Sequence, residues 1–144
     1  MIRCLPLLLL AVLSCSDPQP NQTKDIPTTN FNIPAPNTVV ASDSMRIPDA
    51  LNELYYSIEV VATSQSRQGV YEVLVQYGYN EASTRITMPA SEHPLIPVLK
   101  KNAPNEYIIG FRIPEDNTFK DYFLVRANKG RIEMKYLKAY FIKP

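Results

Sequence analysis

The sequence contains few of the residues that build metal clusters, disulfide frameworks or nucleophile–histidine machinery. Its 144 residues include one histidine (His93), two cysteines (Cys4 and Cys15), four glycines and no tryptophan. The polar, proline-flanked surroundings of His93 indicate an exposed loop, so neither a zinc site nor a Ser-His-Asp arrangement is expected. No glycine-rich phosphate loop is present. The scarcity of these residues and motifs disfavours catalysis. The sequence therefore predicts a protein that is not an enzyme and holds no cofactor.

Charge is nearly balanced overall but unevenly distributed along the chain. Fifteen Lys and Arg residues face fourteen Asp and Glu, a formal net charge of +1. Nucleic acid is therefore not an expected partner, because its binding requires a basic excess. From Lys100 onward ten basic residues stand against five acidic ones, whereas residues 16–99 carry four against nine. This split can orient the protein toward a charged partner, or it can mean only that facing strands carry complementary rims.

The first residues have the pattern of a secretory signal peptide. Arg3 precedes an apolar run over residues 5–13 that only Pro6 interrupts. As a helix this run would span about 14 Å, well short of the ~30 Å hydrocarbon core of a bilayer. The pattern therefore predicts a signal peptide over residues 1–14 rather than a membrane-spanning or buried core helix.

The apolar run ends in Val12-Leu13-Ser14-Cys15, which resembles the lipobox of bacterial lipoproteins. The resemblance covers the first 15 residues. It implies that the Cys15 thiol receives a diacylglyceryl group, that cleavage occurs before Cys15, and that the new amino group is acylated. Two or three acyl chains would anchor the protein stably in a membrane. Leu13 departs from the class, which more often has a small residue there, and an ordinary signal peptide with a leftover cysteine is the alternative.

The residues after Cys15 bear on location. Within the lipoprotein class, Ser16 in place of aspartate implies sorting to the outer membrane. Ser16-Asp17 is also similar to the surface-export signals of Bacteroidetes lipoproteins, although Pro18-Gln19 departs from their acidic run. The expected location is the cell envelope, at the outer membrane, facing either the periplasm or the surface.

A polar segment separates Cys15 from the rest of the chain. Residues 15–45 contain five prolines and few strongly apolar side chains, so they cannot bury enough surface to offset the entropy of ordering. We expect an extended tether over 15–45 and a domain over 46–144, with an early edge strand at 37–41 as the alternative. Asp43-Ser44-Met45 resembles the O-glycosylation acceptor motif of Bacteroidetes, which makes Ser44 a candidate acceptor.

The rest of the chain shows the period of two that is typical of β-strands. Apolar and aromatic residues alternate over 56–62, 71–77 and 107–113, and further strands are expected at 83–88, 95–99, 119–127 and 131–142. Pro97 confines 95–99 to an edge or an irregular strand. The sequence thus predicts an all-β domain, an immunoglobulin-like antiparallel β-sandwich of about seven strands, with a small β-barrel as the alternative. The tryptophan and cysteine pair of true immunoglobulin domains are absent.

Tyrosine is the most abundant side chain able to form a binding site, with nine residues against five phenylalanines. Most are expected on strands, with hydroxyls reaching the rim of the core. Tyr77 and Tyr79 flank Gly78 at a strand end and form a candidate exposed aromatic site.

The C-terminal hairpin offers a second candidate site. A three-residue loop over residues 128–130 would place Tyr122 opposite Tyr136 and Lys120 opposite Lys138. These residues could form a cationic–aromatic contact for an acidic partner or glycan. Alternatively, both lysines reach water at the rim of the core.

These patterns favour a non-catalytic envelope lipoprotein, a lipid-tethered β-sandwich that binds or scaffolds an envelope protein or glycan. The alternative is an envelope enzyme, or an enzyme subunit, whose catalytic residues are dispersed in sequence. Two carboxylates that meet in space would suffice for such an enzyme.

Overall fold

The structure is a computed structural model that describes residues 32–48, 51–113, 115 and 117–140. The signal peptide, Cys15 and most of the expected tether lie outside these residues, so their roles stay predictions. No helix in the described part of the chain is both long and apolar enough to span a bilayer.

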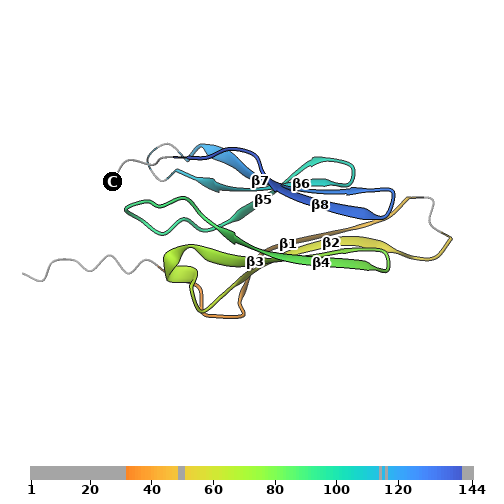
Figure 1. Cartoon of the computed structure of the whole chain (residues 1–144), viewed down its shortest axis with the longest axis horizontal. Coiled ribbons are helices and arrows are strands. Elements are labelled where there is room, and N and C mark those ends of the chain that lie inside the picture. The colour runs from red at the N-terminus through yellow and green to blue at the C-terminus, as the bar shows by residue number, and fades with distance from the viewer. Residues whose placement is uncertain (1–31, 49–50, 114, 116, 141–144) are drawn as a thin grey trace, which may run out of the picture. The chain divides into compact units, whose positions relative to one another are not determined.

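Two antiparallel sheets of four strands form the domain (Figure 1), which confirms the predicted β-sandwich, and the sheets do not close into a barrel. Sheet A contains β1 (Val39–Arg46), β2 (Tyr55–Ala62), β3 (Val70–Tyr77) and β4 (Asn80–Thr87). Sheet B contains β5 (Val98–Ala103), β6 (Glu106–Arg112), β7 (Phe119–Asn128) and β8 (Arg131–Tyr136). One short 3₁₀ helix, η1 (Ser66–Gln68), joins β2 to β3. Each sheet is a meander of neighbouring strands, whereas immunoglobulin domains connect their sheets by Greek keys.

The first strand begins earlier than the sequence indicated. Residues 39–46 pair with β2 along its length, so residues 39–45 belong to sheet A and not to the predicted tether. The alternative of an early edge strand describes this segment better. The prediction failed because β1 lies at the edge of its sheet and only three of its eight residues are partly buried, the others being exposed, which leaves little hydrophobic pattern to detect.

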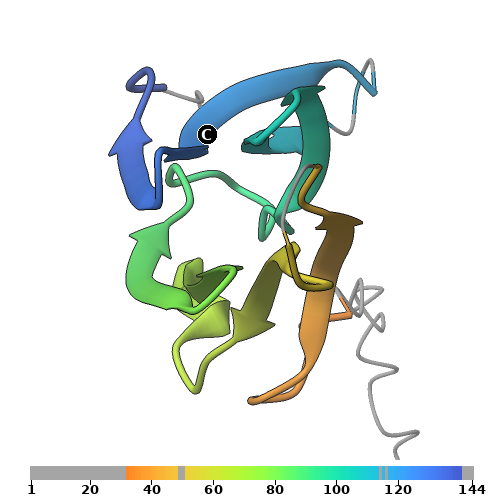
Figure 2. The ribbon, with the colours of Figure 1, turned by 90° about the vertical axis from the view of Figure 1, so that its right-hand side faces the viewer.

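The two layers are aligned so that the strands at their edges meet. Figure 2 looks along the strands and shows β1 beside β5 on one side and β4 beside β8 on the other. The core between the layers is rich in aromatic and β-branched residues. Its fully buried side chains include Tyr56, Tyr71, Tyr107, Phe111, Ile58, Ile86, Ile109, Val60, Val73 and Val125.

Tyrosine hydroxyls cross this core from one sheet to the other. The Tyr56 hydroxyl of sheet A donates to the Val125 carbonyl of sheet B at 3.3 Å. The Tyr107 hydroxyl of sheet B donates to Asp43 Oδ2 of sheet A at 2.9 Å. Burial is the main cause that raises the pKa of both phenols, so they remain neutral donors at physiological pH. Most tyrosine hydroxyls are expected at the rim of the core, and Tyr56 departs from this because its hydroxyl bond is buried.

Thr87, the last residue of β4, forms two more hydrogen bonds with tyrosine hydroxyls of sheet B. The Tyr122 hydroxyl donates to the Thr87 carbonyl at 2.6 Å, and the Thr87 amide donates to the Tyr136 hydroxyl at 3.1 Å. At the other end of β4, Asn80 Nδ2 donates to the Gly130 carbonyl at 3.0 Å. Both ends of β4 are therefore fixed to sheet B.

The C-terminal hairpin has a different register from the one predicted. Asn128 pairs with Arg131, so the loop has two residues, Lys129 and Gly130, with φ of 47° and 76°. Two residues with positive φ make a type I′ turn, whose twist matches the flanking strands better than the expected three-residue loop.

This shift changes every predicted pair in the hairpin. Tyr136 lies opposite Phe123 rather than Tyr122. Lys120 lies opposite Phe111 of β6, and Lys138 follows the end of β8. The predicted pairing of Lys120 with Lys138 is therefore wrong.

A bulge in β7 nevertheless brings Tyr122 to Tyr136. Tyr122 is the extra residue where the register with β6 shifts beside Gly110, and both Tyr122 and Phe123 contact the Tyr136 ring, with centroids 5.2 and 5.0 Å apart. A Cβ at position 110 would overlap the Lys120 carbonyl oxygen. Glycine is required there because the two backbones approach closely at the bulge.

Candidate functional site

A hollow beside the end of β8 contains three of the predicted site residues. It has a volume of about 420 Å³ and is lined by Tyr122, Tyr136, Leu137, Lys138 and Ala139; we call it the β8 hollow. The Leu137 amide donates to the Tyr122 carbonyl at 2.8 Å, which holds the segment after β8 against β7. The prediction grouped Tyr122, Tyr136 and Lys138 correctly, but on a wrong register. The contact between Tyr122 and Tyr136 comes from the bulge in β7.

The aromatic surface of the β8 hollow is exposed yet held in place. Tyr136 is 51% exposed and Leu137 37% exposed, although the Tyr136 ring packs edge-on against two aromatic rings and its hydroxyl accepts the Thr87 amide. A ring fixed in this way loses little entropy on binding. Lys120 does not line the hollow, so the structure separates it from the other predicted residues.

The other aromatic candidate divides into one packed and one exposed ring. Tyr77 faces the core and contacts the Tyr56 ring at 5.5 Å between centroids. Tyr79 is 79% exposed and forms, with Gly78, the two-residue turn between β3 and β4, where its hydroxyl accepts a hydrogen bond from Asn52 Nδ2 at 3.4 Å. Tyr77 and Tyr79 therefore do not form one exposed aromatic surface.

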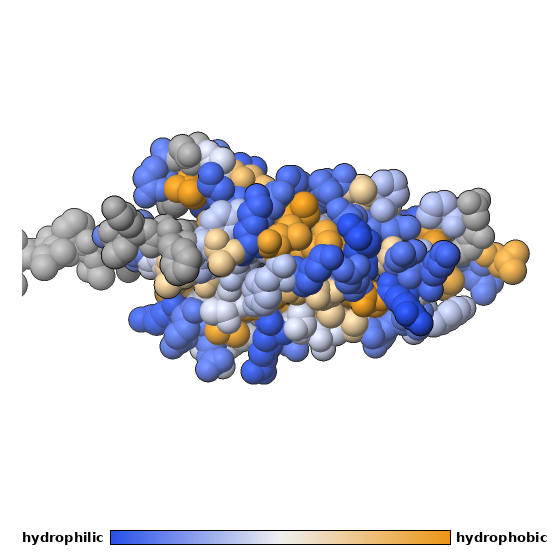
Figure 3. Space-filling view, turned by 45° about the horizontal axis from the view of Figure 1, so that its top comes forward, coloured by the Kyte–Doolittle hydropathy of each residue, from blue (hydrophilic) through white to orange (hydrophobic). Residues whose placement is uncertain are grey.

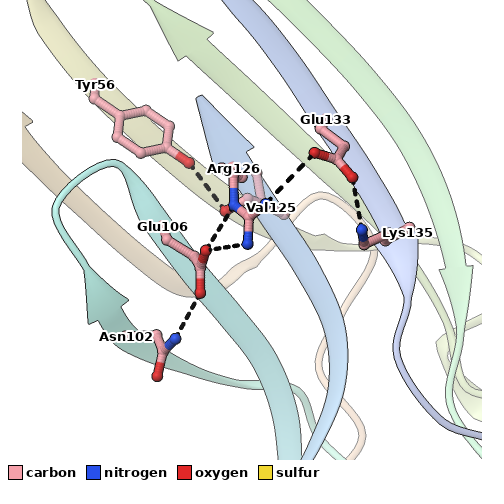
Figure 4. A network of polar contacts seen from close by, with 7 residues as sticks. All are labelled: Tyr56, Asn102, Glu106, Val125, Arg126, Glu133 and Lys135. Atoms are coloured by element: carbon pink, nitrogen blue, oxygen red, sulfur yellow. Dashed lines mark hydrogen bonds and ion pairs between the residues drawn. The ribbon is translucent and has the colours of Figure 1, made fainter. Parts of the chain in front are cut away.

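The outer face of sheet B carries a network of paired charges (Figure 4). Arg126 lies between two carboxylates, with Nη2 2.7 Å from Glu106 Oε2 and Nη1 3.9 Å from Glu133 Oε2. Lys135 Nζ lies 2.7 Å from Glu133 Oε1. A hydrogen bond from Asn102, followed by one from Arg126, lowers the pKa of Glu106. Most of these charges neutralise one another, so this network is not an open cationic surface.

Apolar residues lie beneath those charges. Ile108 and Leu124 pair across β6 and β7 on the outer face, with Lys100 and Lys135 at the two edges of the same row. They are only 4% and 3% exposed, which indicates that long neighbouring side chains cover them. Figure 3 views the molecule obliquely from the side of sheet B and shows apolar surface in the middle, framed by hydrophilic residues.

The outer face of sheet A holds a second and larger hollow that the sequence reasoning missed. It has a volume of about 490 Å³ and is lined by eight residues of β2, β3 and β4, six of which share the outer face: Ser57, Glu59, Leu74, Gln76, Glu81 and Ser83. We call it the sheet A groove. The alternation of each strand indicated which of these residues point outward, but only the register between strands brings the six together.

Ser44 lies on the same face of sheet A. It is exposed on the edge strand β1, pairs with Ser57 of the groove, and its amide donates to Asp43 Oδ1 at 2.8 Å. Its accessibility suits an O-glycosylation acceptor, and the modification stays a prediction.

Neither a search for metal-binding clusters nor comparison with known proteins identifies a further functional site. Among the described residues, no group of three or more His, Cys, Asp or Glu is placed to hold a metal ion. His93 is partly buried in the loop between β4 and β5, where the Ser91 hydroxyl donates to its carbonyl. No protein-family model matches the chain, and searches of curated proteins and of solved structures find no match.

The network on sheet B makes the stability of the domain depend on pH. Because the folded state lowers the pKa of Glu106, its contribution is present above the ordinary carboxyl pKa and is lost as pH falls through the folded value. We expect Glu106→Gln to lower the free energy of unfolding at pH 7 by about 1 kcal/mol. Urea titrations from pH 7 down to ~3 should show the difference from wild type shrinking.

Glu133→Gln is the matched control for this prediction, because Glu133 is the more exposed carboxylate of the network. Its substitution should cost less than that of Glu106. A Glu106→Gln protein as stable as wild type at pH 7, or a loss that persists unchanged at low pH, would contradict the assignment.

Proposed function

We propose that the protein is a non-catalytic lipoprotein of the cell envelope, attached to the outer membrane through acyl chains on Cys15. Its β-sandwich binds an acidic envelope protein or glycan and holds it near the membrane. The lipobox-like sequence supports the anchor, and the single histidine of the chain supports binding over catalysis. Residues 16–36 then connect the anchor to the domain as a tether, because the Asn37 amide already donates to the Ala62 carbonyl of β2.

The observation that carries the binding proposal is the β8 hollow. A half-exposed Tyr136 ring and the Leu137 side chain offer apolar contact, and Lys138 adds a positive charge beside them. Aromatic rings bind sugar faces or apolar side chains at low entropic cost, while the ammonium attracts an acidic group. The chemistry therefore fits a ligand that combines an apolar face with a carboxylate or another anion.

One observation favours the second candidate, an envelope enzyme. The sheet A groove holds two carboxylates, Glu59 and Glu81, and two carboxylates can hydrolyse a glycosidic bond when a sugar lies between them. A saccharide added to the protein separates the two functions, because an enzyme would shorten it and a binding site would leave it intact.

Cys15→Ala should release the protein from the membrane, because the acyl chains on Cys15 are the proposed anchor. Fractionation of host cells should then find the variant in the soluble fraction, and mass spectrometry of the wild type should find acyl chains on Cys15. A variant that stays in the membrane fraction, with no acyl chains on the wild-type protein, would contradict the anchor.

Lys138→Gln should weaken retention of the envelope partner that copurifies with the native protein after detergent extraction. The exposed lysine makes no ion pair within the described part of the chain, so its loss should leave the urea midpoint unchanged. Wild-type retention should fall as salt is raised, since the contact is electrostatic.

Lys101→Gln is the matched control, because Lys101 is exposed on β5, the opposite edge strand of sheet B. It should retain the partner as wild type does. Undiminished retention by Lys138→Gln at low salt would rule out the β8 hollow as the binding site.

A further inference from the structure

The sheet A groove is built as a regular grid of side chains. The register places Ser57, Gln76 and Glu81 side by side in one row across β2, β3 and β4. The next row on the same face contains Glu59, Leu74 and Ser83. With strands about 4.8 Å apart and same-face neighbours about 6.8 Å apart along a strand, the grid covers roughly 10 by 7 Å. That area matches one or two sugar rings.

The alternation of short and long side chains explains why this face is hollowed. Ser57 and Ser83 lie at opposite corners of the grid, and the other four positions carry longer side chains. The serines therefore leave space at two corners of the grid, beside the longer Glu59, Leu74, Gln76 and Glu81. Leu74 is 38% exposed and supplies an apolar contact.

We propose that the sheet A groove binds a saccharide that carries a free amino group. Five of its six side chains offer hydroxyl, amide or carboxylate groups, which together can bond the hydroxyls of a sugar. Leu74 can contact the C–H groups of the ring. The two carboxylates favour a ligand with positive charge, which an amino sugar provides.

Local charge supports this choice. Neither Glu59 nor Glu81 forms an ion pair within the part of the chain that the structure describes. The strands of sheet A carry four acidic residues against two arginines, Arg46 and Arg85. Arg46 lies opposite Tyr55 and Arg85 opposite Glu72, so neither is a direct cross-strand neighbour of the two groove carboxylates.

A basic peptide fits the groove less well than a saccharide. A lysine side chain would present one ammonium group to Glu59 or Glu81 and would not use the serine hydroxyls or the amide oxygen of Gln76, whose Nε2 already donates to the Gly78 carbonyl. A saccharide has polar groups on most of its ring carbons and can use the whole grid. The proposal depends neither on Cys15 nor on the β8 hollow, because sheet A provides every residue involved.

The experiment titrates the full-length mature protein with a glucosamine tetramer and follows binding by calorimetry. The wild type should bind, and the Glu59→Gln/Glu81→Gln double variant should bind about tenfold more weakly, since each exposed charge pair contributes modestly. The fully N-acetylated tetramer, which lacks the ammonium groups, should also bind more weakly than the glucosamine tetramer. Glu72→Gln is the matched control, because Glu72 lies on the same face outside the groove, and it should bind as wild type does.

Several results would overturn the proposal. One is the absence of binding by the glucosamine tetramer, and another is an equal loss of affinity in Glu72→Gln. Tetralysine that binds as tightly as the tetramer, with the same dependence on Glu59 and Glu81, would show that the groove selects positive charge and not a sugar. Shortened oligosaccharides in the mass spectrum would show a catalytic site in place of a binding site.

Discussion

Hydrogen bonds of tyrosine hydroxyls between the two sheets are the interaction on which the arrangement of this domain depends. Each sheet is a complete meander, so the two layers share no strand and no ladder of backbone hydrogen bonds. Tyr56, Tyr107, Tyr122 and Tyr136 each bond a group on the opposite sheet. Hydrophobic burial alone would bring the layers together without choosing one alignment. These directional bonds fix that alignment, and loss of the buried one from Tyr56 would leave a polar group in the core without a partner, which is costly.

Because each sheet is formed by four consecutive strands, the uneven charge of the sequence is divided between the two sheets. The acidic half of the chain forms sheet A and the basic half forms sheet B. On sheet B most charges pair with one another, and the exposed Lys138 lies beside the aromatic β8 hollow. On sheet A the groove keeps Glu59 and Glu81 open to solvent. A module with separate sites on its two sheets can join two partners, as the proposed scaffolding role requires.

The sequence contained the alternation that locates most strands. Pro97 indicated an edge or irregular strand over 95–99, and the observed edge strand β5 begins after that proline, so only residues 98 and 99 of the predicted range belong to it. The register between strands could not be predicted from the sequence. Lys129 adopts positive φ, which its residue type does not indicate, and this one-residue difference moved every pair of the C-terminal hairpin. The bulge that restores the contact between Tyr122 and Tyr136 depends on the facing Gly110 of another strand. The sheet A groove likewise arises only when three strands align.

The most direct test of the cross-sheet tyrosine bonds removes the hydroxyls and keeps the rings. A variant with Tyr56→Phe, Tyr107→Phe and Tyr122→Phe retains the aromatic packing but loses three donors. Its free energy of unfolding in urea should fall by about 3 kcal/mol, at roughly 1 kcal/mol for each bond, whereas Tyr55→Phe, at the half-exposed Tyr55, should change little. If the triple variant unfolds at the same urea concentration as wild type, the hydroxyl bonds do not hold the two sheets together.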